Sequence, residues 1–371
     1  MSFERSRDLR HMRLALRLAA RGYGRVSPNP QVGAVIVKSG RIIGQGWHRR
    51  AGDAHAEIEA LRDAARRRQR PLGATLYVTL EPCCTHGRTP PCTDAIIASG
   101  IKRVVVAATD PNPAHAGWGF RILRRAGIEV VNGLLAGEAA RLNEGFNHWI
   151  VHRTPFVMVK AAMTIDGKIA AASGESRWIT GRKARAHGMK LRRGTDAILV
   201  GVNTVLADDP SLTARPVQAH PLRRIILDSR ARTPLNSRVV SDASARLTTV
   251  IVGREAPQRR VAALAKRVQV WRAPARSGKI DPRWLLKKLG AAKVTSLLVE
   301  GGAEVNASFL LAGLTQRVAF FYAPKILGGR DAIKAVGGGG IRRRADMIRL
   351  GEIEWRRFGP DLFLTARVDE S

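Results

Sequence analysis

Apolar and polar residues alternate in this chain with a period that switches repeatedly between helix and strand. Near the N-terminus, Leu9, Met12, Leu16 and Ala19 recur three or four residues apart, which predicts the first helix of a domain. Residues 33–47 hold two apolar runs around a Ser-Gly turn and predict a β-hairpin. A helical pattern follows them, and the alternation of strands and helices continues to about residue 150.

A second series of buried strands begins after residue 150, with helical stretches between several of them. Its apolar runs predict strands in the segments FVMVKAAM, DAILVG, RRIILDS, TTVIVG, SLLVEGG and RVAFFYAPKIL. Strands that alternate with helices are typical of α/β domains. The sequence therefore predicts two α/β domains, at residues 1–150 and 151–371.

Composition narrows the possible partners of these domains. The formal net charge of +33 favours a polyanionic or phosphorylated partner. The arginines are spread along the whole chain, however, and aromatic residues are only 5% of it, so a surface for stacking nucleic-acid bases is not expected. We expect no specific nucleic-acid partner. No apolar stretch has the length of a membrane span, so we expect no membrane partner either.

The three cysteines lie within a dozen residues, at positions 83, 84 and 92. Such a cluster cannot form a disulfide framework across the fold. Reduced thiols predict a cytoplasmic protein and make metal binding the chemistry to consider.

His55, Cys83 and Cys92 supply the three protein ligands of a catalytic zinc site, whose fourth position is left to water. Glu57 follows His55 by two residues and is placed to accept a proton from that water and pass it to a leaving amine. The pattern H-x-E followed by P-C-x-x-C is the signature of zinc nucleobase deaminases. Here the two cysteines stand further apart, with eight residues between them. Cys84 is the alternative ligand to Cys83, which we prefer because it directly follows Pro82.

In the second half, the segment LLVEGGAEVNASFLLAGL predicts a buried strand, a glycine pair and a helix. Free N–H groups at such a helix start favour a phosphate. No G-x-G-x-x-G occurs at a strand-to-helix turn, so a Rossmann fingerprint is not supported. The run of four glycines at 337–340 is interpreted as a flexible loop.

The stretches SPNPQVGAVIV, HAEIEAL, YVTLEPCCTHGRTPPC and DPNPAHAGWG resemble the riboflavin-biosynthesis bifunctional deaminase/reductase family. The wide cysteine spacing is expected there. The resemblance implies a cytidine-deaminase-like three-layer α/β/α domain that removes the 2-amino group of a diaminopyrimidinone ribosylamino 5′-phosphate. It also implies that Asn29 contacts the pyrimidine and Arg88 the phosphate. A histidine that often follows in the family is Thr85 here, so its substrate contact is not carried over.

The same resemblance covers the second half, whose family fold is like dihydrofolate reductase. It implies NADPH as the hydride donor, a ribosyl side chain reduced to ribityl, and a dimer or higher homo-oligomer formed through this domain. The implied cofactor contacts are Ala162, Trp178, Thr204, Asp208 and Ser229, with Gly302, Ala303, Glu304, Val305, Asn306, Ala307 and Ser308 around the phosphates. The implied substrate contacts are Lys160, Asp166, Ser176, Arg192, Leu212, Arg215 and Glu300.

Two other hypotheses fit the residues without the resemblance. A tRNA or DNA base deaminase with a basic accessory domain would lose activity steeply with added salt. A basic binding protein with a structural zinc would need a fourth protein ligand, for which His86 is the nearby candidate.

Overall fold

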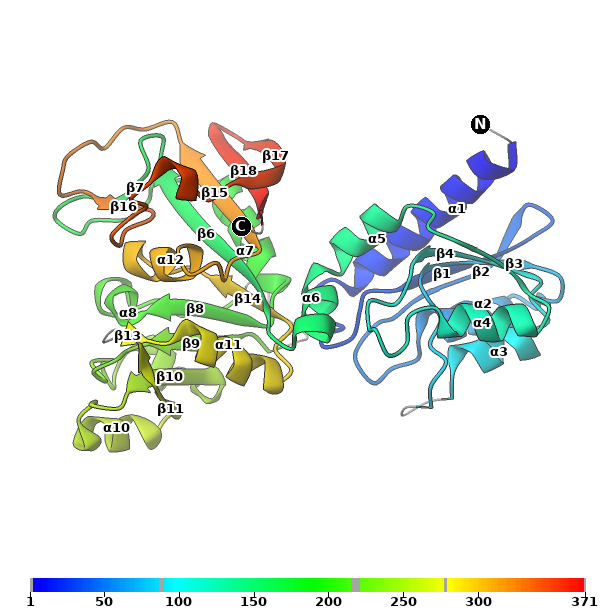
Figure 1. Ribbon diagram of the computed structural model, residues 1–371, viewed down its shortest axis with the longest axis horizontal. Coiled ribbons are helices and arrows are strands. Elements are labelled where there is room, and N and C mark those ends of the chain that lie inside the picture. The colour runs from blue at the N-terminus through cyan, green and yellow to red at the C-terminus, as the bar shows by residue number, and fades with distance from the viewer. Residues whose placement is uncertain (1–2, 87–89, 215–220, 277–278, 370–371) are drawn as a thin grey trace. The chain divides into compact units, whose positions relative to one another are not determined.

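The computed structural model describes residues 3–86, 90–214, 221–276 and 279–369, and the chain divides into two compact units (Figure 1). The first unit is Met1–Arg153 and the second is Thr154–Ser371. The sequence predicts the boundary at residue 150, which lies inside helix α6 (Glu144–His152). Arg88 and Arg215, two of the predicted substrate contacts, lie outside the described residues.

The first unit is built on a five-stranded sheet in the order β2-β1-β3-β4-β5. β1 is antiparallel to both its neighbours, whereas β3, β4 and β5 are parallel. The strands are β1 (Gly33–Lys38), β2 (Arg41–Trp47), β3 (Thr75–Leu80), β4 (Arg103–Ala108) and β5 (Glu129–Asn132). The helices are α1 (Phe3–Ala19), α2 (Ala56–Arg66), α3 (Cys92–Ala98), α4 (Trp118–Arg125), α5 (Ala136–Leu142) and α6, with a short 3₁₀ turn, η1 (Ala20–Gly22).

Helices cover both faces of this sheet, because alternate residues of each strand point to opposite sides. Val35, Tyr77 and Val105 pack with apolar residues of α1 and α5 on one face. Their strand neighbours pack on the other face with residues of α2, α3 and α4 (Figure 1). The three-layer α/β/α prediction is confirmed, as are the first helix and the hairpin with its turn at Ser39 and Gly40.

Strand β2 carries two glycines that set how closely helix α2 approaches the sheet. A Cβ at Gly46 would lie 2.5 Å from the backbone nitrogen of Ala60 and 2.6 Å from the carbonyl oxygen of Ala56. A Cβ at Gly44 would lie 2.3 Å from the carbonyl oxygen of Ala60. Side chains at these positions would push α2 away from β2, and with it the histidine and glutamate at the start of that helix.

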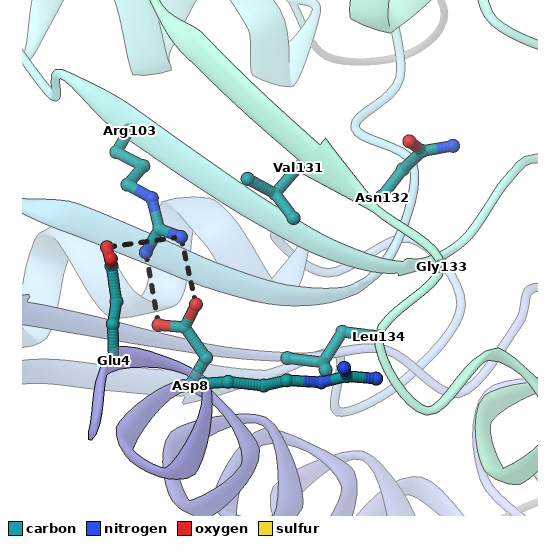
Figure 2. A pocket seen from close by; sticks show the side chains of 8 residues that line it. Glu4, Asp8, Arg103, Val131, Asn132, Gly133 and Leu134 are labelled. Carbon is teal, nitrogen blue, oxygen red and sulfur yellow. Dashed lines mark hydrogen bonds and ion pairs between the residues drawn. The ribbon is translucent and has the colours of Figure 1, made fainter. Parts of the chain in front are cut away.

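A buried ion pair joins α1 to the sheet at a cavity of about 360 Å³ (Figure 2). Arg103 on β4 donates two hydrogen bonds to the carboxylate of Asp8, at 3.0 and 2.9 Å, and Tyr77 donates a third at 2.6 Å. Arg103 also pairs with Glu129. Because Arg103 and Tyr77 both bond to Asp8, the network accounts for the one acidic residue buried in the inward face of α1.

The second unit is built on a nine-stranded sheet in the order β11-β10-β9-β8-β14-β6-β15-β18-β17. All neighbours from β11 to β15 are parallel, and β18 and β17 are antiparallel additions at one edge. The strands are β6 (Phe156–Thr164), β7 (Lys168–Ala170), β8 (Ala197–Gly201), β9 (Arg223–Leu227), β10 (Thr248–Gly253), β11 (Gln269–Ala273), β12 (Ala275–Arg276), β13 (Lys279–Ile280), β14 (Ser296–Val299), β15 (Arg317–Ala323), β16 (Ile333–Lys334), β17 (Leu350–Phe358) and β18 (Asp361–Val368).

Helices again lie on both faces. Leu285 and Leu289 of α11 and Phe309 of α12 pack in one core cluster. Residues of α8, α9 and α10 pack in a second cluster on alternate strand positions, and α7 packs against β15 and β18. The helices are α7 (Arg182–Arg193), α8 (Val202–Asp208), α9 (Arg238–Ser241), α10 (Gln258–Ala265), α11 (Pro282–Ala291) and α12 (Ala303–Leu310), with 3₁₀ turns η2 (Ala245–Leu247) and η3 (Arg344–Asp346).

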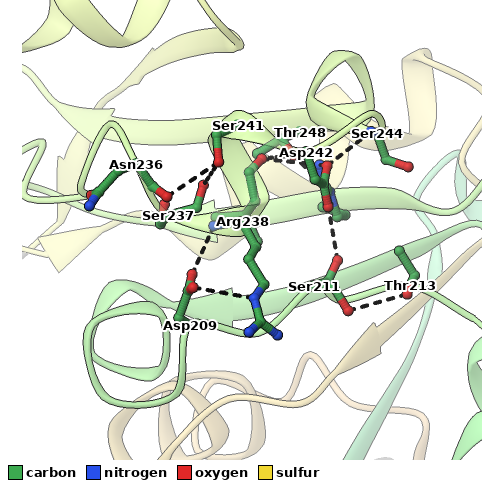
Figure 3. A network of polar contacts seen from close by, with 12 residues as sticks. Asp209, Ser211, Thr213, Asn236, Ser237, Arg238, Ser241, Asp242, Ser244 and Thr248 are labelled. Carbon is green, nitrogen blue, oxygen red and sulfur yellow. Dashed lines mark hydrogen bonds and ion pairs between the residues drawn. The ribbon is translucent and has the colours of Figure 1, made fainter.

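A buried arginine holds the loop after α8 in place. Arg224 on β9 is 1% exposed, donates to both carboxylate oxygens of Asp242 at 2.7 and 2.9 Å, and donates at 2.9 Å to the carbonyl oxygen of Ser211. Asp209 of the same loop pairs with Arg238, and the Ser211 and Thr213 hydroxyls lie 3.3 Å apart (Figure 3). These contacts fix a segment whose Asp209 and Leu212 both have positive φ, of 39° and 48°.

The four-glycine run forms a loop, as the sequence predicts, and two of its glycines contact helix α12. Gly337 donates a backbone hydrogen bond to the carbonyl oxygen of Ala303 at 3.0 Å, and Gly338 donates one to the Glu304 carboxylate at 2.9 Å. A Cβ at Gly337 would lie 2.9 Å from the Cβ of Ala303. The glycines therefore allow this loop to pack directly on the first turn of α12. Throughout the described part of the chain, we find no helix with the length and apolar character needed to cross a membrane.

Candidate functional site

In the first unit, His55, Cys83 and Cys92 converge at the ends of three elements. His55 precedes α2, Cys83 follows β3, and Cys92 begins α3. His55 Nδ1 lies 3.4 Å from Cys83 Sγ and 3.3 Å from Cys92 Sγ, and the three ligand atoms all lie within 4.8 Å of one another. Zinc bonds of about 2.3 Å to sulfur and about 2.0 Å to nitrogen, at a tetrahedral angle, separate such atoms by roughly 3.5 Å. The donor set therefore fits a zinc ion.

The two sulfurs differ in how readily they lose a proton. The hydrogen bond with Cys92 lowers the pKa of the Cys83 thiol to about 4, and His55 and the backbone N–H of Cys92 contribute in the same direction. The hydrogen bond with Cys83 raises the pKa of Cys92. Cys83 is thus a thiolate that accepts from the Cys92 thiol. Because zinc binds thiolates, loading the site must displace the remaining proton.

Glu57 lies beside this group in the first turn of α2 and is 3% exposed. Burial raises the pKa of its carboxyl to about 7, and the Cys83 thiolate adds to the rise. A carboxyl with that pKa exchanges a proton readily near neutral pH.

Asn29 connects to the metal group through a histidine that the sequence patterns do not reveal. The Asn29 side-chain nitrogen lies 3.1 Å from His48 Nε2, and His48 Nδ1 lies 3.1 Å from the carbonyl oxygen of Ala54. Burial lowers the pKa of His48, so the ring is neutral, donates from Nδ1 and accepts from Asn29. The rings of His48 and His55 meet edge to face at 5.5 Å. His48 therefore fixes which way the Asn29 amide points.

Glu81 is a second residue that the patterns do not single out. Its carboxylate is buried and accepts hydrogen bonds from the backbone N–H groups of Asp110, Gly117 and Gly119, at 3.1, 3.0 and 2.9 Å. A Cβ at Gly119 would lie 2.5 Å from the carbonyl oxygen of Pro82. These contacts hold the loop after β4 against the segment that carries Cys83.

The alternative ligands do not join the metal group. Across the described residues, the group that can hold an ion consists of His55, Cys83 and Cys92, and Cys84 and His86 are outside it. His86 is exposed. Three protein ligands leave a coordination position open, as in a catalytic zinc site.

In the second unit, a cavity of about 440 Å³ lies at the carboxyl ends of the parallel strands. Its walls come from the loops after β7, β8, β9 and β14 and from the starts of α8 and α12. Ligands of open α/β sheets bind at this edge. Gly302 caps α12, and a glycine has no side chain with which to accept from the first N–H groups of the helix. Such amides suit the phosphates of a dinucleotide.

The cavity floor depends on two glycines at the ends of neighbouring strands. A Cβ at Gly301, after β14, would lie 2.4 Å from Val305 Cβ, and a Cβ at Gly201, ending β8, would lie 2.9 Å from Val305 Cγ2. The first turn of α12 can therefore approach both strands. Gly302, Ala303, Glu304 and Val305 line the cavity, whereas Asn306 and Ala307 are buried.

A buried ion cluster stands beside this cavity. Arg192 of α7 donates to both oxygens of Glu300, at 2.8 and 2.9 Å, and Lys160 of β6 donates at 3.3 Å. Burial alone would raise the pKa of Glu300, but the charges of Arg192 and Lys160 outweigh it and lower the pKa to about 2. Two basic side chains therefore pair with one carboxylate, and the cluster carries one formal net positive charge.

The resemblance assigns Arg192 to the substrate, but its guanidinium group points toward Glu300. Its remaining Nη1 donates at 3.1 Å to the carbonyl oxygen of Thr213, in the loop held by Arg224. Leu212 of that loop is buried in the core, so a substrate contact there would use its backbone.

The other predicted residues of this unit fall into two groups. Ser176, Thr204 and Asp208 line the cavity, and the Ser176 hydroxyl donates to Asp208 at 3.2 Å. The second group lies outside the described cavity lining and consists of Ala162 within β6, Asp166, Trp178, Ser229 and the end of the 302–308 run. Trp178 is 65% exposed, and Asp166 accepts from the backbone N–H groups of Leu327 and Gly328.

Comparison with known proteins agrees with this architecture. The model of the RibD C-terminal domain matches residues 155–364, and that of the cytidine and deoxycytidylate deaminase zinc-binding region matches residues 5–108. The riboflavin biosynthesis protein RibD of Actinobacillus pleuropneumoniae is 45% identical over 363 residues, which cover 98% of this chain and 96% of that protein. RibD of Escherichia coli is 41% identical over 373 residues, covering 96% of this chain and 98% of that protein.

The chain belongs to the RibD family. A solved structure of Acinetobacter baumannii RibD superimposes with a TM-score of 0.86 and 36% identity, over 99% of this chain and 100% of that one. The deaminase/reductase of Thermotoga maritima superimposes with a TM-score of 0.84 and 36% identity, with the same coverage.

Membership of the RibD family confirms the predicted family, fold class and enzyme classes. The chain is a bifunctional deaminase and reductase of riboflavin biosynthesis, with a zinc-binding deaminase unit and an NADPH-dependent reductase unit. The roles of individual site residues stay predictions.

The two adjacent cysteines give a direct test of the ligand set. We expect Cys83→Ser to lose zinc, because a hydroxyl is a poor replacement for a thiolate ligand, and Cys84→Ser to retain it. Zinc content of the purified full chain, measured by elemental analysis, checks both. Retention of zinc by Cys83→Ser together with loss from Cys84→Ser would reverse the assignment.

Proposed function

We propose that the enzyme deaminates 2,5-diamino-6-(5-phosphoribosylamino)pyrimidin-4(3H)-one and then reduces the ribosyl side chain of the resulting 5-amino-6-(5-phosphoribosylamino)uracil to ribityl. The substrate follows from similarity to the Thermotoga maritima protein, which is described as the deaminase/reductase for these compounds. The observation that carries the proposal is the three-ligand group His55, Cys83 and Cys92 with Glu57 buried beside it. The paired assay is ammonia release and NADPH oxidation from the diaminopyrimidinone; neither activity in zinc-loaded protein would refute the proposal.

In the deaminase unit, His55, Cys83 and Cys92 would hold the zinc. When bound, zinc lowers the pKa of a coordinated water and so supplies a nucleophile near neutral pH. Glu57, buried in the first turn of α2 beside the three ligand residues, accepts a proton from the water and delivers it to the departing amine. The C–N bond breaks, a C–O bond forms, and ammonia leaves. Asn29, oriented by His48, holds the pyrimidine edge.

Glu57 is the residue on which the proton transfers depend. We expect Glu57→Gln to bind zinc normally and to lower the rate of ammonia release by about 10²- to 10⁴-fold, the usual contribution of a general acid–base. When this variant is supplied directly with the aminouracil, its rate of NADPH oxidation should be unchanged. Normal deamination by this variant would remove Glu57 from the mechanism.

In the reductase unit, the first N–H groups of α12 and the residues around the cavity would hold NADPH, which supplies the hydride. The Lys160–Glu300–Arg192 cluster would attract the substrate phosphate through its net positive charge. Ser176, next to Asp208 on the cavity wall, would contact the same substrate. The substrate contacts predicted at Arg88 and Arg215 remain proposals from the resemblance alone.

Arg192 forms an ion pair with Glu300 and is also a proposed substrate contact. Arg192→Lys keeps the charge that Glu300 needs but loses the bidentate geometry. We expect this variant to raise the KM for the aminouracil about tenfold, because loss of one charge-assisted hydrogen bond costs about 1.5–3 kcal/mol. Ammonia release should be nearly unchanged. Equal losses in both reactions would indicate misfolding instead.

We further propose a cytoplasmic homodimer formed through the edge strand β17. Among the described strands it pairs with β18 alone, and Ile353 and Trp355 on it are 53% and 58% exposed. Leu362 of β18 adds to the exposed apolar surface. A long edge strand with exposed apolar side chains favours pairing with a second chain.

Sedimentation of the full chain tests the dimer. Trp355→Glu places a charge in the proposed interface and should shift the protein from dimer to monomer. Leu72→Glu, an exposed apolar position in the other unit, is the matched control and should leave the dimer intact. A wild-type monomer at micromolar concentration, or a Trp355→Glu dimer, would contradict the proposal.

A further inference from the structure

We propose that Arg232 recognises the 2′-phosphate that distinguishes NADPH from NADH, and so determines which coenzyme the reductase unit uses. The proposal rests on the proposed function in one respect, because it takes the cavity of the second unit as the coenzyme site. It assigns a role to a residue that neither the sequence patterns nor the family motifs single out.

The order of the strands determines which residues lie at each end of the cavity. β9, β8, β14 and β6 are successive neighbours in the sheet, and their carboxyl ends point to the same edge. The ion cluster of Lys160, Glu300 and Arg192 belongs to the β14 and β6 side, where the substrate would be reduced. Leu227, the last residue of β9, and Arg232, five residues later, line the cavity from the opposite side. A coenzyme with its nicotinamide near the cluster would extend toward β9.

The charges around the cavity leave Arg232 with no acidic partner. Arg232 is the one basic residue among the described residues that line the cavity, where the acidic ones are Asp208, Glu300 and Glu304. Each of those three carboxylates already has a cation, namely Arg177 for Asp208, Arg192 for Glu300 and Lys279 for Glu304. Arg232 donates instead to the neutral side-chain oxygen of Asn203, at 2.7 Å, and the ion pairs found across the described segments do not include it.

The loop that carries Arg232 is held rigidly. Asp228 is fully buried and accepts hydrogen bonds from both the backbone N–H and the hydroxyl of Thr233, each at 2.7 Å. Arg260 of α10 donates to the carbonyl oxygens of Ala231 and Thr233, at 3.0 and 3.3 Å. Arg232 itself is exposed at the cavity wall. An exposed guanidinium on a fixed loop, oriented by a neutral amide, is prepared for an anion at little conformational cost.

The anion that fits this position is the 2′-phosphate. The pyrophosphate of the coenzyme would use the uncapped N–H groups at the start of α12, which lie after β14. In other dinucleotide sites, an arginine near the adenosine ribose accommodates the 2′-phosphate. Arg232 follows β9, which is two strands from β14 in the sheet. It donates to Asn203, which directly precedes the predicted cofactor contact Thr204. A guanidinium binds a phosphate through two parallel hydrogen bonds.

The test compares Arg232→Ala with Arg230→Ala in the full-length enzyme. Arg230 is exposed, lies two residues away and is not among the residues lining the cavity, so its removal changes the net charge equally. We expect Arg232→Ala to raise the KM for NADPH by about 10- to 100-fold, as for a lost charge-assisted hydrogen bond, and the KM for NADH by less than about twofold. Arg230→Ala should change neither value. Arg232→Lys should restore part of the preference, because it keeps a point charge.

A binding measurement separates this inference from the proposed reductase function. 2′,5′-ADP and 5′-AMP differ only in the 2′-phosphate, and calorimetry with each needs no turnover. We expect the wild type to bind 2′,5′-ADP at least about tenfold more tightly, and Arg232→Ala to lose that preference. Equal weakening of both nucleotides, or an unchanged preference in Arg232→Ala, would overturn the role of Arg232. Preferential binding of 2′,5′-ADP without NADPH oxidation would uphold Arg232 and refute the reductase proposal.

Discussion

The deaminase unit depends on bringing the start of one helix and two ends of a loop to a single point. His55 precedes Cys83 by 28 residues and Cys92 follows Cys83 by nine, yet the three ligand atoms lie at the separations of a zinc coordination sphere. This is possible because α2 rests directly on β2 through Gly44 and Gly46 and because Glu81 secures the loop beside Pro82. The same approach buries Glu57, and burial is the main reason that its pKa rises to about 7. The close packing of α2 on the sheet therefore contributes both to the position of the metal ligands and to the raised pKa of Glu57.

Much of this could be predicted from the sequence, because the signals are local. The spacing of Leu9, Met12 and Leu16 predicts α1, and the motif around His55 and Glu57 predicts the metal group with its neighbouring acid. The buried strands of both units also have continuous apolar runs, which is typical of strands covered on two faces.

The remaining features are set by contacts between distant segments. β17 was not predicted, because most of its residues are exposed and its charges and apolar residues alternate without a buried face. The four glycines after Val336 suggest flexibility, and only the position of α12 shows why glycine is needed there. His48 has no motif, and its role follows from its contacts with Asn29 and Ala54. The position of β14 between β8 and β6 likewise has no local signal, although it places Glu300 between Lys160 and Arg192.

The large excess of basic residues has a specific consequence at the reductase cavity. Three carboxylates line the described part of the cavity. Lys160, Arg177, Arg192 and Lys279 form ion pairs with these carboxylates, and a fifth cation, Arg232, lines the cavity itself. Five positive and three negative charges leave a surplus of two. One of these surplus charges belongs to the Lys160–Glu300–Arg192 cluster and the other to Arg232, so each of the two proposed phosphate contacts has one positive charge in excess. Arginine elsewhere on the surface raises the general attraction for anions. At the cavity, specificity for one anion requires that some cations be neutralised by carboxylates while another remains available to the ligand. Arg192 is paired with Glu300, whereas Arg232 has no carboxylate partner among the described residues.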